Sequence, residues 1–361
     1  MFNNEMNVAL HKAAPEQLKE KPDQDNLGFG QHFTDHIFVM DWNREIGWHD
    51  ARIKPYGDFV LDPAAMVFHY GQAIFEGLKA YCGKDGKLLL FRPKDNLERL
   101  NKSALRMCMP RIPVDNVLQS LKALVYLDRD WVPKNEGATL YLRPTMIASE
   151  PALGLRPSNQ YTFFIISSPV GAYYAQGFEP VTIYVEDHYV RAVPGGVGEA
   201  KTAGNYAASV KALMEANEKN CSQVLWLDAT ERKYIEEVGT SNIFFVINDE
   251  LVTPPLSGTI LPGITRDSVL QLAKDWNMKT VERPITIDEV IETNNDGSLK
   301  EIFGTGTAAV ISPIGELHYK DQIITINNKQ TGEVSKRFFD ELQALQRGYR
   351  EDPHKWLVSV G

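Results

Sequence analysis

The residues best suited to chemistry lie in one short run, GGVGEAKT, at positions 195–202. This run nearly matches the phosphate-binding P-loop, in which glycines precede a lysine and a hydroxyl residue. Ala200 breaks the pattern, because the glycine normally found there lets the loop backbone curl around the phosphates. The run VLWLD at 224–228 resembles the acidic strand of such a site, but any buried strand that ends in a turn looks the same. A P-loop NTPase is therefore one hypothesis for this chain.

A second glycine-rich run, GTGTAA at 304–309, follows two apolar residues, as in a dinucleotide-binding fold. That fold requires a helix directly after the glycines, because the helix N-terminus binds the pyrophosphate. The next residues, VISP at 310–313, instead favour a strand that ends at a proline. We therefore expect a tight turn here, whose backbone amides and threonine hydroxyls can face an anion.

Lys201 is also a candidate nucleophile. It lies between the glycine-rich loop and the small-residue segment AGNY at 203–206. Partial burial disfavours an ammonium and lowers its pKa, which a lysine needs in order to attack a carbonyl. A solvated lysine at the start of a helix is the alternative, and this residue alone does not decide between the two.

The groups that pyridoxal phosphate requires are present elsewhere in the chain. Glu237 can hold the pyridinium nitrogen, although a surface acid at a strand end is the alternative. The run LPG at 261–263 precedes a helix predicted from Thr265, so free amides and the helix dipole can meet a phosphate, unless the run simply starts a helix. Arg99 lies off the apolar stripe of its predicted helix and can add a charge-assisted bond, although such an arginine is more often solvated.

Hydrophobic periodicity predicts the elements that must position these residues. Residues 1–28 are polar and aperiodic, and we expect them to form an arm. Residues 29–170 are expected to form a small α+β domain. Its predicted strands are 36–42, 75–81, 88–91, 139–147 and 161–167, and its predicted helices are 94–107 and 114–130.

A stretch rich in Gly, Pro and aromatic residues, 171–180, predicts a linker between two domains. We expect residues 181–361 to form a larger domain that resembles an irregular barrel, because many short strands accompany few long helices. Its predicted strands are 181–186, 224–227, 242–247, 279–284, 301–304 and 309–311, and its predicted helices are 207–218, 265–277 and 335–347.

Length and composition limit the possible classes. A chain of 361 residues predicts two domains, and 43% hydrophobic with 24% charged residues is typical of globular proteins. The net charge of -9 gives no general attraction to nucleic acid or to an anionic membrane, and no apolar run is long enough to span a bilayer. Three widely spaced cysteines predict neither a disulfide framework nor a metal site, so we expect a cytoplasmic protein.

Eight sequence blocks, in order, resemble those of the branched-chain amino acid aminotransferases, which are pyridoxal-phosphate enzymes of fold type IV. The similarity extends from about Phe29 to Trp356. The resemblance implies an α/β protein of the α+β type, with a smaller N-terminal α+β domain and a larger pseudo-barrel domain that carries Lys201. The blocks are FTDH (33–36), HYGQAIFEGLKAY (69–81), YLRP (141–144), EPALGLRP (150–157), GGVGEAKTAGNYAAS (195–209), EEVGTSNIFF (236–245), LSGTILPGITR (256–266) and FGTGTAAV (303–310).

The resemblance also implies the site residues. Lys201 would be the catalytic residue and would hold pyridoxal 5'-phosphate through a Schiff base, and no metal is implied. The implied cofactor-binding residues are Arg99, Lys201, Tyr206, Glu237, Thr240, Ile264, Thr265 and Thr307. The implied substrate-binding residues are Phe29, Tyr70, Phe75, Tyr141, Arg143, Leu153, Leu155, Tyr173, Thr240, Thr307 and Ala308. Leu153 and Leu155 would come from the neighbouring subunit of a homodimer with shared active sites.

The implied substrates are leucine, isoleucine, valine, glutamate and their 2-oxo acids, exchanged in a ping-pong reaction that ends biosynthesis or begins degradation of branched-chain amino acids. One methylene is worth only ~1 to 3 kcal/mol, so broad use of the branched side chains is expected. The pocket can accept glutamate only if a tyrosine hydroxyl or Arg143 reaches its γ-carboxylate. Two relatives of the same fold, the D-amino acid aminotransferases and the aminodeoxychorismate lyases, are the alternatives, but the YLRP strand and the GTAA turn favour the L-branched-chain group.

Overall fold

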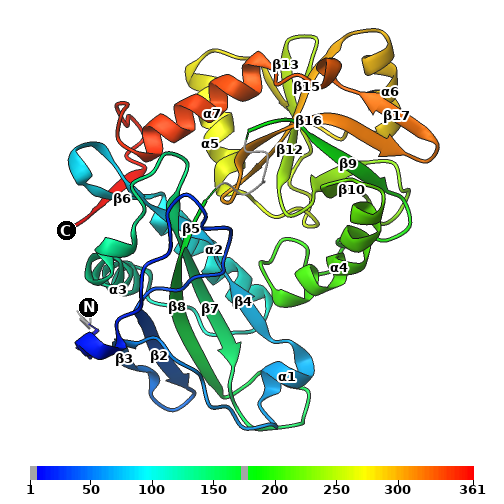
Figure 1. Cartoon of the computed structure of the whole chain (residues 1–361). Helices are drawn as coiled ribbons and strands as arrows, with labels where there is room; N and C mark the ends of the chain where they lie inside the picture. The colour runs from blue at the N-terminus through cyan, green and yellow to red at the C-terminus, as the bar shows by residue number, and fades with distance from the viewer. Residues whose placement is uncertain (1–5, 172–177) are drawn as a thin grey trace. The chain divides into compact units, whose positions relative to one another are not determined.

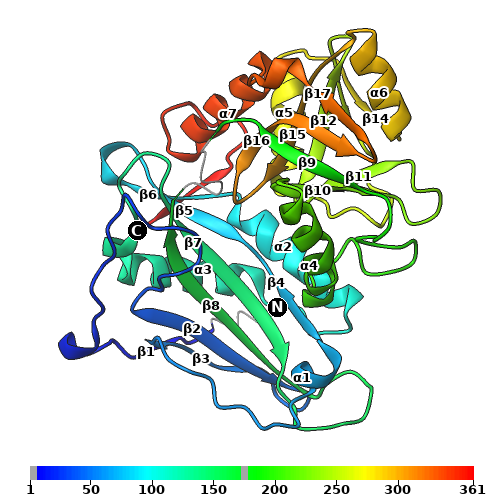
Figure 2. The same ribbon diagram turned by 45° about the vertical axis from the view of Figure 1, so that its right-hand side comes forward.

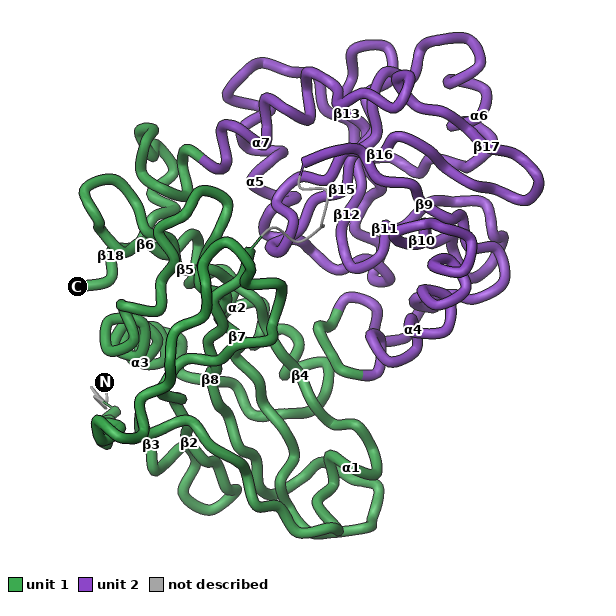
Figure 3. The backbone as a smooth tube through the Cα atoms, viewed as in Figure 1, with its two compact units in different colours: residues 1–173, 200–203, 344–361 green, residues 174–199, 204–343 purple. Residues whose placement is uncertain are grey.

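The computed structural model describes residues 6–171 and 178–361, and the chain divides into two compact units (Figure 3). The first consists of residues 1–173, 200–203 and 344–361, and the second of residues 174–199 and 204–343. Residues 200–203, which include Lys201, group with the first unit, whereas the sequence-based boundaries assign them to the larger domain. Tyr173 and most of the expected linker lie outside the described residues.

The first unit is built on one sheet with the strand order β1-β3-β2-β8-β7-β5-β6-β18, and β4 pairs with β7 (Figure 1). Neighbouring strands are antiparallel except β1 and β3. The strands are β1 (Ala9–Leu10), β2 (His36–Asn43), β3 (Gly47–Pro55), β4 (Ala73–Phe75), β5 (Leu78–Cys82), β6 (Leu88–Phe91), β7 (Thr139–Ala148), β8 (Gln160–Val170) and β18 (Leu357–Val360). The helices are α1 (Met66–Tyr70), α2 (Pro93–Arg106) and α3 (Val114–Leu127).

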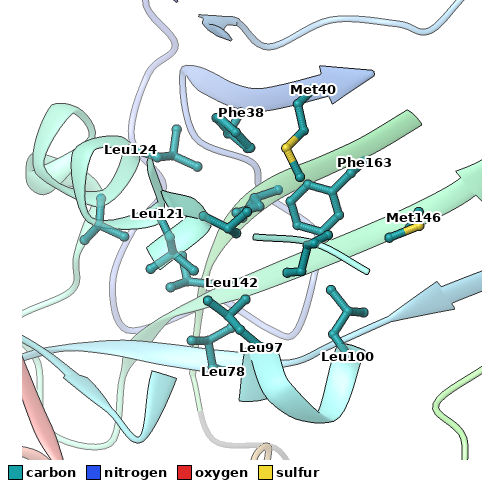
Figure 4. Packing of buried hydrophobic residues seen from close by; sticks show 14 of the residues in the cluster. Phe38, Met40, Leu78, Leu97, Leu100, Leu121, Leu124, Leu142, Met146 and Phe163 are labelled. Atoms are coloured by element: carbon teal, nitrogen blue, oxygen red, sulfur yellow. The ribbon is translucent and has the colours of Figure 1, made fainter. Parts of the chain in front are cut away.

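Helices α2 and α3 cover one face of this sheet. Their leucines, among them Leu97 and Leu121, pack against strand residues such as Leu78, Leu142 and Phe163 in one buried cluster (Figure 4). Side chains alternate between the two faces of a strand. Lys79, which is paired with Tyr141 across β5 and β7, therefore lies on the face opposite this cluster.

The second unit contains a mixed sheet with the strand order β11-β10-β9-β16-β15-β12-β13-β14, and β17 pairs with β16 (Figure 2). The parallel pairs are β9 with β10, β9 with β16, and β13 with β14. The strands are β9 (Val181–Glu186), β10 (Gln223–Leu227), β11 (Ile235–Val238), β12 (Asn242–Ile247), β13 (Glu250–Thr253), β14 (Thr280–Glu282), β15 (Leu299–Gly306), β16 (Val310–Tyr319) and β17 (Gln322–Thr325). The helices are α4 (Ala203–Glu218), α5 (Ile264–Asp275), α6 (Ile287–Asn295) and α7 (Glu333–Gln346).

Most of the expected elements are present, with three kinds of difference. The expected strand 75–81 is interrupted at Glu76 and Gly77, which separate β4 from β5. The expected helix 114–130 ends at Leu127, and a short 3-10 helix, Arg129–Trp131, follows it. The elements that were not expected are β1, β3, β11, β13, β17, β18, α1 and α6.

The glycine-rich run at 304–309 forms the expected turn. Strand β15 ends at Gly306, β16 begins at Val310, and the two strands pair antiparallel. The expectation that the second strand ends at the proline is wrong, because Pro313 lies within β16, which continues to Tyr319. A dinucleotide-binding fold is therefore excluded, as expected, because a strand and not a helix follows these glycines. No helix among the residues that the structure describes combines the length and the apolarity needed to cross a bilayer.

The packing of α2 predicts a contrast between two leucines of this helix. Leu100 is fully buried in the cluster, whereas Leu105 is 73% exposed. We expect Leu100→Ala to lower the free energy of unfolding by about 2–5 kcal/mol, because it leaves a cavity. Leu105→Ala is the control and should change it by less than about 0.5 kcal/mol. Denaturant unfolding of both variants checks this, and equal losses would show that α2 packs differently.

Candidate active site

The backbone around Lys201 is attached to the edge of the first unit's sheet. The Lys201 amide donates a hydrogen bond to Ser103 Oγ of α2 at 2.9 Å, and its carbonyl accepts one from the Phe75 amide at 3.0 Å. The hydroxyl of Thr202 donates to the carbonyl of Ala73 at 2.8 Å. The lysine is thus held between β4 and α2, both of which belong to its own unit.

The side chain of Lys201 lies in surroundings that disfavour its charge. Its Nζ is 4.7 Å from the centroid of the Phe75 ring. Burial is the largest cause that lowers its pKa, and Arg99 and Arg143 lower it further, while Glu76 and Tyr141 act in the opposite direction. The resulting pKa is about 8. A useful fraction of the amine is therefore neutral near neutral pH, as a nucleophile requires.

Arg99 forms a buried ion pair with Glu76. Its Nε and Nη2 atoms donate to the two carboxylate oxygens at 2.8 and 2.9 Å. The side chains of Arg99 and Glu76 are 7% and 0% exposed. The solvated alternative for Arg99 is therefore wrong, and sequence reasoning missed Glu76. The available signal was an acid between the apolar residues of the run AIFEGLKAY.

Four of the expected substrate-binding residues lie together in this unit. Arg143 Nη2 donates to the Tyr141 hydroxyl at 3.0 Å, and its guanidinium lies 4.6 Å from the Phe75 ring centroid. The Phe29 ring meets Tyr141 edge-on, with 5.1 Å between centroids. Gly77 allows this arrangement, because a Cβ atom there would collide with the Tyr141 hydroxyl.

Tyr70 lies beside Leu153, and its hydroxyl donates to the Leu153 carbonyl. Both residues are exposed in the single chain, Tyr70 at 38% and Leu153 at 65%, and Leu155 is 84% exposed. Phe68, which lies on α1 shortly before Tyr70, is 62% exposed. We call these four residues the apolar patch.

In the second unit, Glu237 of β11 is nearly fully buried. Its Oε1 atom accepts a hydrogen bond from the Leu261 amide at 2.7 Å and lies 3.3 Å from Arg191 Nη2. Arg191 also donates to the carbonyls of Gly198 and Thr259. Arg191 thus compensates the charge of Glu237 and connects it to the loop that precedes Lys201 in the sequence. No sequence signal distinguished Arg191 from other arginines.

The start of α5 offers backbone amides to an anion. Gly263 is the N-cap residue, and no side chain caps this helix. A Cβ atom at Gly263 would collide with Asn242, and one at Gly306 would lie 2.8 Å from Ser241 Oγ. These two glycines therefore bring the starts of α5 and β12 and the end of β15 close together. The first turn of α5 begins with Ile264 and Thr265.

The remaining predicted residues of this unit lie in turns or in the first turn of a helix. Thr240 is exposed at the tip of the turn between β11 and β12, and Thr307 and Ala308 are partly exposed in the turn between β15 and β16. Tyr206 is partly exposed in the first turn of α4. Among the described residues, no group of three or more His, Cys, Asp or Glu side chains could hold a metal ion.

Comparisons with known proteins agree with these observations. Residues 73–317 match the family of class IV aminotransferases. The chain is 56% identical over 342 residues to branched-chain-amino-acid aminotransferase 2 of Bacillus subtilis, covering 95% of this chain and 94% of that protein.

Two solved structures are similar at lower identity. The branched-chain amino acid aminotransferase of Escherichia coli superposes with a TM-score of 0.76 at 26% identity, covering 91% of this chain and 99% of that one. The enzyme of the same name from the organism abbreviated T.th., solved with pyridoxamine 5'-phosphate, gives a TM-score of 0.75 at 26% identity, covering 89% and 98%.

The chain therefore belongs to the class IV aminotransferases and, within them, to the branched-chain-amino-acid aminotransferases. The resemblance and the fold class expected from the sequence are confirmed. The P-loop hypothesis is not supported, because GGVGEAKT lies within the residues that match this family.

The pKa of Lys201 predicts how the apoenzyme reacts with pyridoxal phosphate. Only the neutral amine attacks an aldehyde, so the rate should rise with pH and reach half of its maximum at about pH 8. At pH 7 about a tenth of the amine is neutral, against roughly one in a few thousand for an ordinary lysine. Stopped-flow absorbance measures this rate, with Lys201→Ala as the control. A midpoint near pH 10 would contradict the environment described here.

Proposed function

We propose that this protein is a pyridoxal-phosphate-dependent transaminase that moves the amino group of leucine, isoleucine or valine reversibly to 2-oxoglutarate. The anchored Lys201, with its pKa of about 8 beside an apolar wall, carries the proposal. The relative from Bacillus subtilis, which is named a branched-chain-amino-acid aminotransferase, supports it at 56% identity. The T.th. structure, solved with pyridoxamine 5'-phosphate, supports the cofactor.

The residues present fit this cofactor on chemical grounds. Glu237 would hold the ring nitrogen, because Arg191 and the Leu261 amide stabilise its negative charge. The uncapped first turn of α5, with Ile264 and Thr265, would bind the phosphate, because helix N-termini favour anions. We also assign Thr307, Thr240, Arg99 and Tyr206 to the cofactor.

Arg99 would serve the phosphate while Glu76 holds its guanidinium. Glu76 accepts hydrogen bonds from the Nε and Nη2 atoms of Arg99. Glu76 also neutralises the charge that Arg99 would otherwise bring close to Lys201. We therefore assign Glu76 a positioning role, in which it fixes the direction of the guanidinium.

When bound, pyridoxal phosphate supplies an aldehyde that accepts amino groups and a protonated ring that withdraws electrons from the substrate. Lys201 Nζ would take the proton from the substrate Cα and deliver it, within the same half of the reaction, to the cofactor carbon that carries the transferred nitrogen. It would move a proton in the opposite direction in the second half. The low pKa of Lys201 suits this exchange, because the same nitrogen must accept and release a proton near neutral pH.

The aromatic wall explains the preference for branched side chains. Phe29, Phe75 and Tyr141 offer apolar surface, and Arg143 is the cation beside them. Arg143 and the Tyr141 hydroxyl would bind the γ-carboxylate of glutamate, which allows one pocket to accept both substrate types. Aspartate, whose carboxylate is one methylene closer to Cα, should be a poor donor. The turn at Thr307 and Ala308 would bind the α-carboxylate.

Reductive trapping tests the assignment of Lys201. Borohydride reduces the linkage between lysine and aldehyde to a stable amine, so peptide mapping of the treated holoenzyme should find the label at position 201. Lys201→Ala should lose the label and nearly all turnover with leucine and 2-oxoglutarate. Lys79→Ala is a matched control, because Lys79 is also a buried lysine of the same unit and should keep position 201 labelled. A label elsewhere, or none, refutes the proposal.

We further propose that the protein forms a homodimer with shared active sites. The apolar patch supports this, because Phe68, Leu153 and Leu155 are 62%, 65% and 84% exposed in the single chain, and gathered exposed apolar side chains mark interaction surfaces. The patch would place Tyr70, Leu153 and Leu155 against the substrate pocket of a second copy. The free thiols of Cys82, Cys108 and Cys221 suit a reducing compartment, so we propose that the dimer works in the cytoplasm.

The dimer proposal predicts the effect of a charge in the apolar patch. Leu155→Glu buries an unpaired carboxylate in the interface, so it should convert dimers to monomers at micromolar concentration. Val60→Glu is the control, because Val60 is 98% exposed and lies outside the patch. Light scattering coupled to size exclusion measures the mass. A wild-type monomer, or a dimer that persists in Leu155→Glu, would contradict the proposal.

A further inference from the structure

Residues 9–29 form a segment along the first unit that contains the strand β1 and a short 3-10 helix, Pro15–Gln17, and that ends at the proposed substrate pocket. Strand β1 pairs with β3, and the amide of His11 donates to the Ile53 carbonyl at 2.8 Å. At the other end, Leu27 is buried, and the Gly28 carbonyl accepts a hydrogen bond from the Gly171 amide at 3.0 Å. The next residue, Phe29, contacts Tyr141. We call residues 9–29 the N-terminal segment.

Two adjacent side chains, Asp35 and His36, hold the middle of this segment. The amide of Ala13 donates to His36 Nε2 at 2.9 Å. The amide of Lys19 donates to Asp35 Oδ1 at 2.8 Å, and the Lys19 ammonium donates to the Thr34 carbonyl at 2.8 Å. We call these three hydrogen bonds the latch.

The side chains of His36 and Asp35 are themselves held by residues at the end of α3 and in the 3-10 helix that follows it. His36 Nδ1 lies 2.6 Å from Asp128 Oδ1, which assigns the ring proton to Nδ1 and leaves Nε2 as the acceptor for Ala13. Asp35 Oδ2 accepts a hydrogen bond from Trp131 Nε1 at 2.7 Å. His36 and Asp128 are nearly fully buried, so the surrounding side chains also restrict their movement.

We propose that Asp35 and His36 are positioning residues that hold the N-terminal segment and thereby keep Phe29 against Tyr141. This inference rests on the proposed function, because it treats Phe29 as a wall of the substrate pocket. Tyr141 is held by a hydrogen bond from Arg143, so it does not follow Phe29 when Phe29 is displaced. The displacement therefore opens the pocket on the side where the branched side chain must pack. Loss of the latch should therefore weaken substrate binding and leave the chemistry at Lys201 intact.

Two substitutions of His36 separate the latch from general packing. Asparagine places an amide nitrogen near the Nδ1 position, so His36→Asn keeps the bond to Asp128 but does not reach Ala13. Glutamine reaches the Nε2 position, so His36→Gln keeps an acceptor for the Ala13 amide. His49→Asn is the control, because His49 of β3 contacts Asn43 and Asp50 and not the segment.

The experiment combines hydrogen exchange with steady-state kinetics. In His36→Asn, the amides of residues 13–19 should exchange faster, and the KM for the branched 2-oxo acid should rise about 3- to 10-fold, which corresponds to the loss of one or two hydrogen bonds. kcat should stay within about twofold. His36→Gln and His49→Asn should resemble the wild type in both measurements.

A double-mutant cycle tests whether Phe29 transmits the effect. Phe29→Ala should raise the KM by itself, and adding His36→Asn should then raise it no further. If His36→Asn does not fold, a chain shortened to begin at Ala14 removes the Ala13 donor and should give the same rise in KM.

Several results would overturn the latch. These are an unchanged KM or unchanged exchange in His36→Asn, equal damage in His36→Gln, or additive effects with Phe29→Ala. Hydrogen exchange needs no turnover, so a failed latch is distinguishable from a failed function. If borohydride labels position 201 and the latch variants behave as the wild type, only the latch is wrong.

Discussion

The first unit's part of the site depends on one constraint, which is that three cations must be accommodated close together beside an apolar wall. Lys201, Arg99 and Arg143 all act on the same small volume, and burial makes an unpaired charge expensive. Each cation is accommodated differently. Arg99 is neutralised by Glu76, Arg143 donates to the Tyr141 hydroxyl, and Lys201 gives up its proton at a lower pH than an ordinary lysine. The reactivity of the amine therefore follows from the way in which its neighbours are satisfied.

The sheet of the first unit makes this arrangement possible through the alternation of its side chains. Leu78 and Leu142 face the helices, so Lys79, Tyr141 and Arg143 must lie on the other face. Glu76 lies in the interruption between β4 and β5, where Arg99 of α2 binds its carboxylate.

Local patterns predicted much of this structure, and long-range pairings account for the rest. Helix α2 was predictable because Leu97, Leu100 and Ala104 repeat at helical spacing, and the turn after Gly306 was predictable because Val310 begins a β-branched run. Strand β3 and helix α6 escaped prediction because their apolar residues are few and are interleaved with charges. The partners of Arg99 and Glu237 also escaped, because no local pattern indicates which acid or arginine lies across the fold.

The same distinction explains why chemistry was easier to predict than specificity. The proposed chemistry depends on a few residue types in short blocks, above all Lys201 and Glu237, whose types already limit what they can do. The proposed pocket wall instead combines Phe29, Phe75 and Tyr141, which lie far apart in the sequence. Phe29 belongs to an N-terminal segment that is hydrogen-bonded at Gly28 as well as at Ala13 and Lys19. If the proposed latch acts as we infer, a weak hydrogen bond far from the amine influences which side chain is accepted and leaves the proton transfer at Lys201 unchanged.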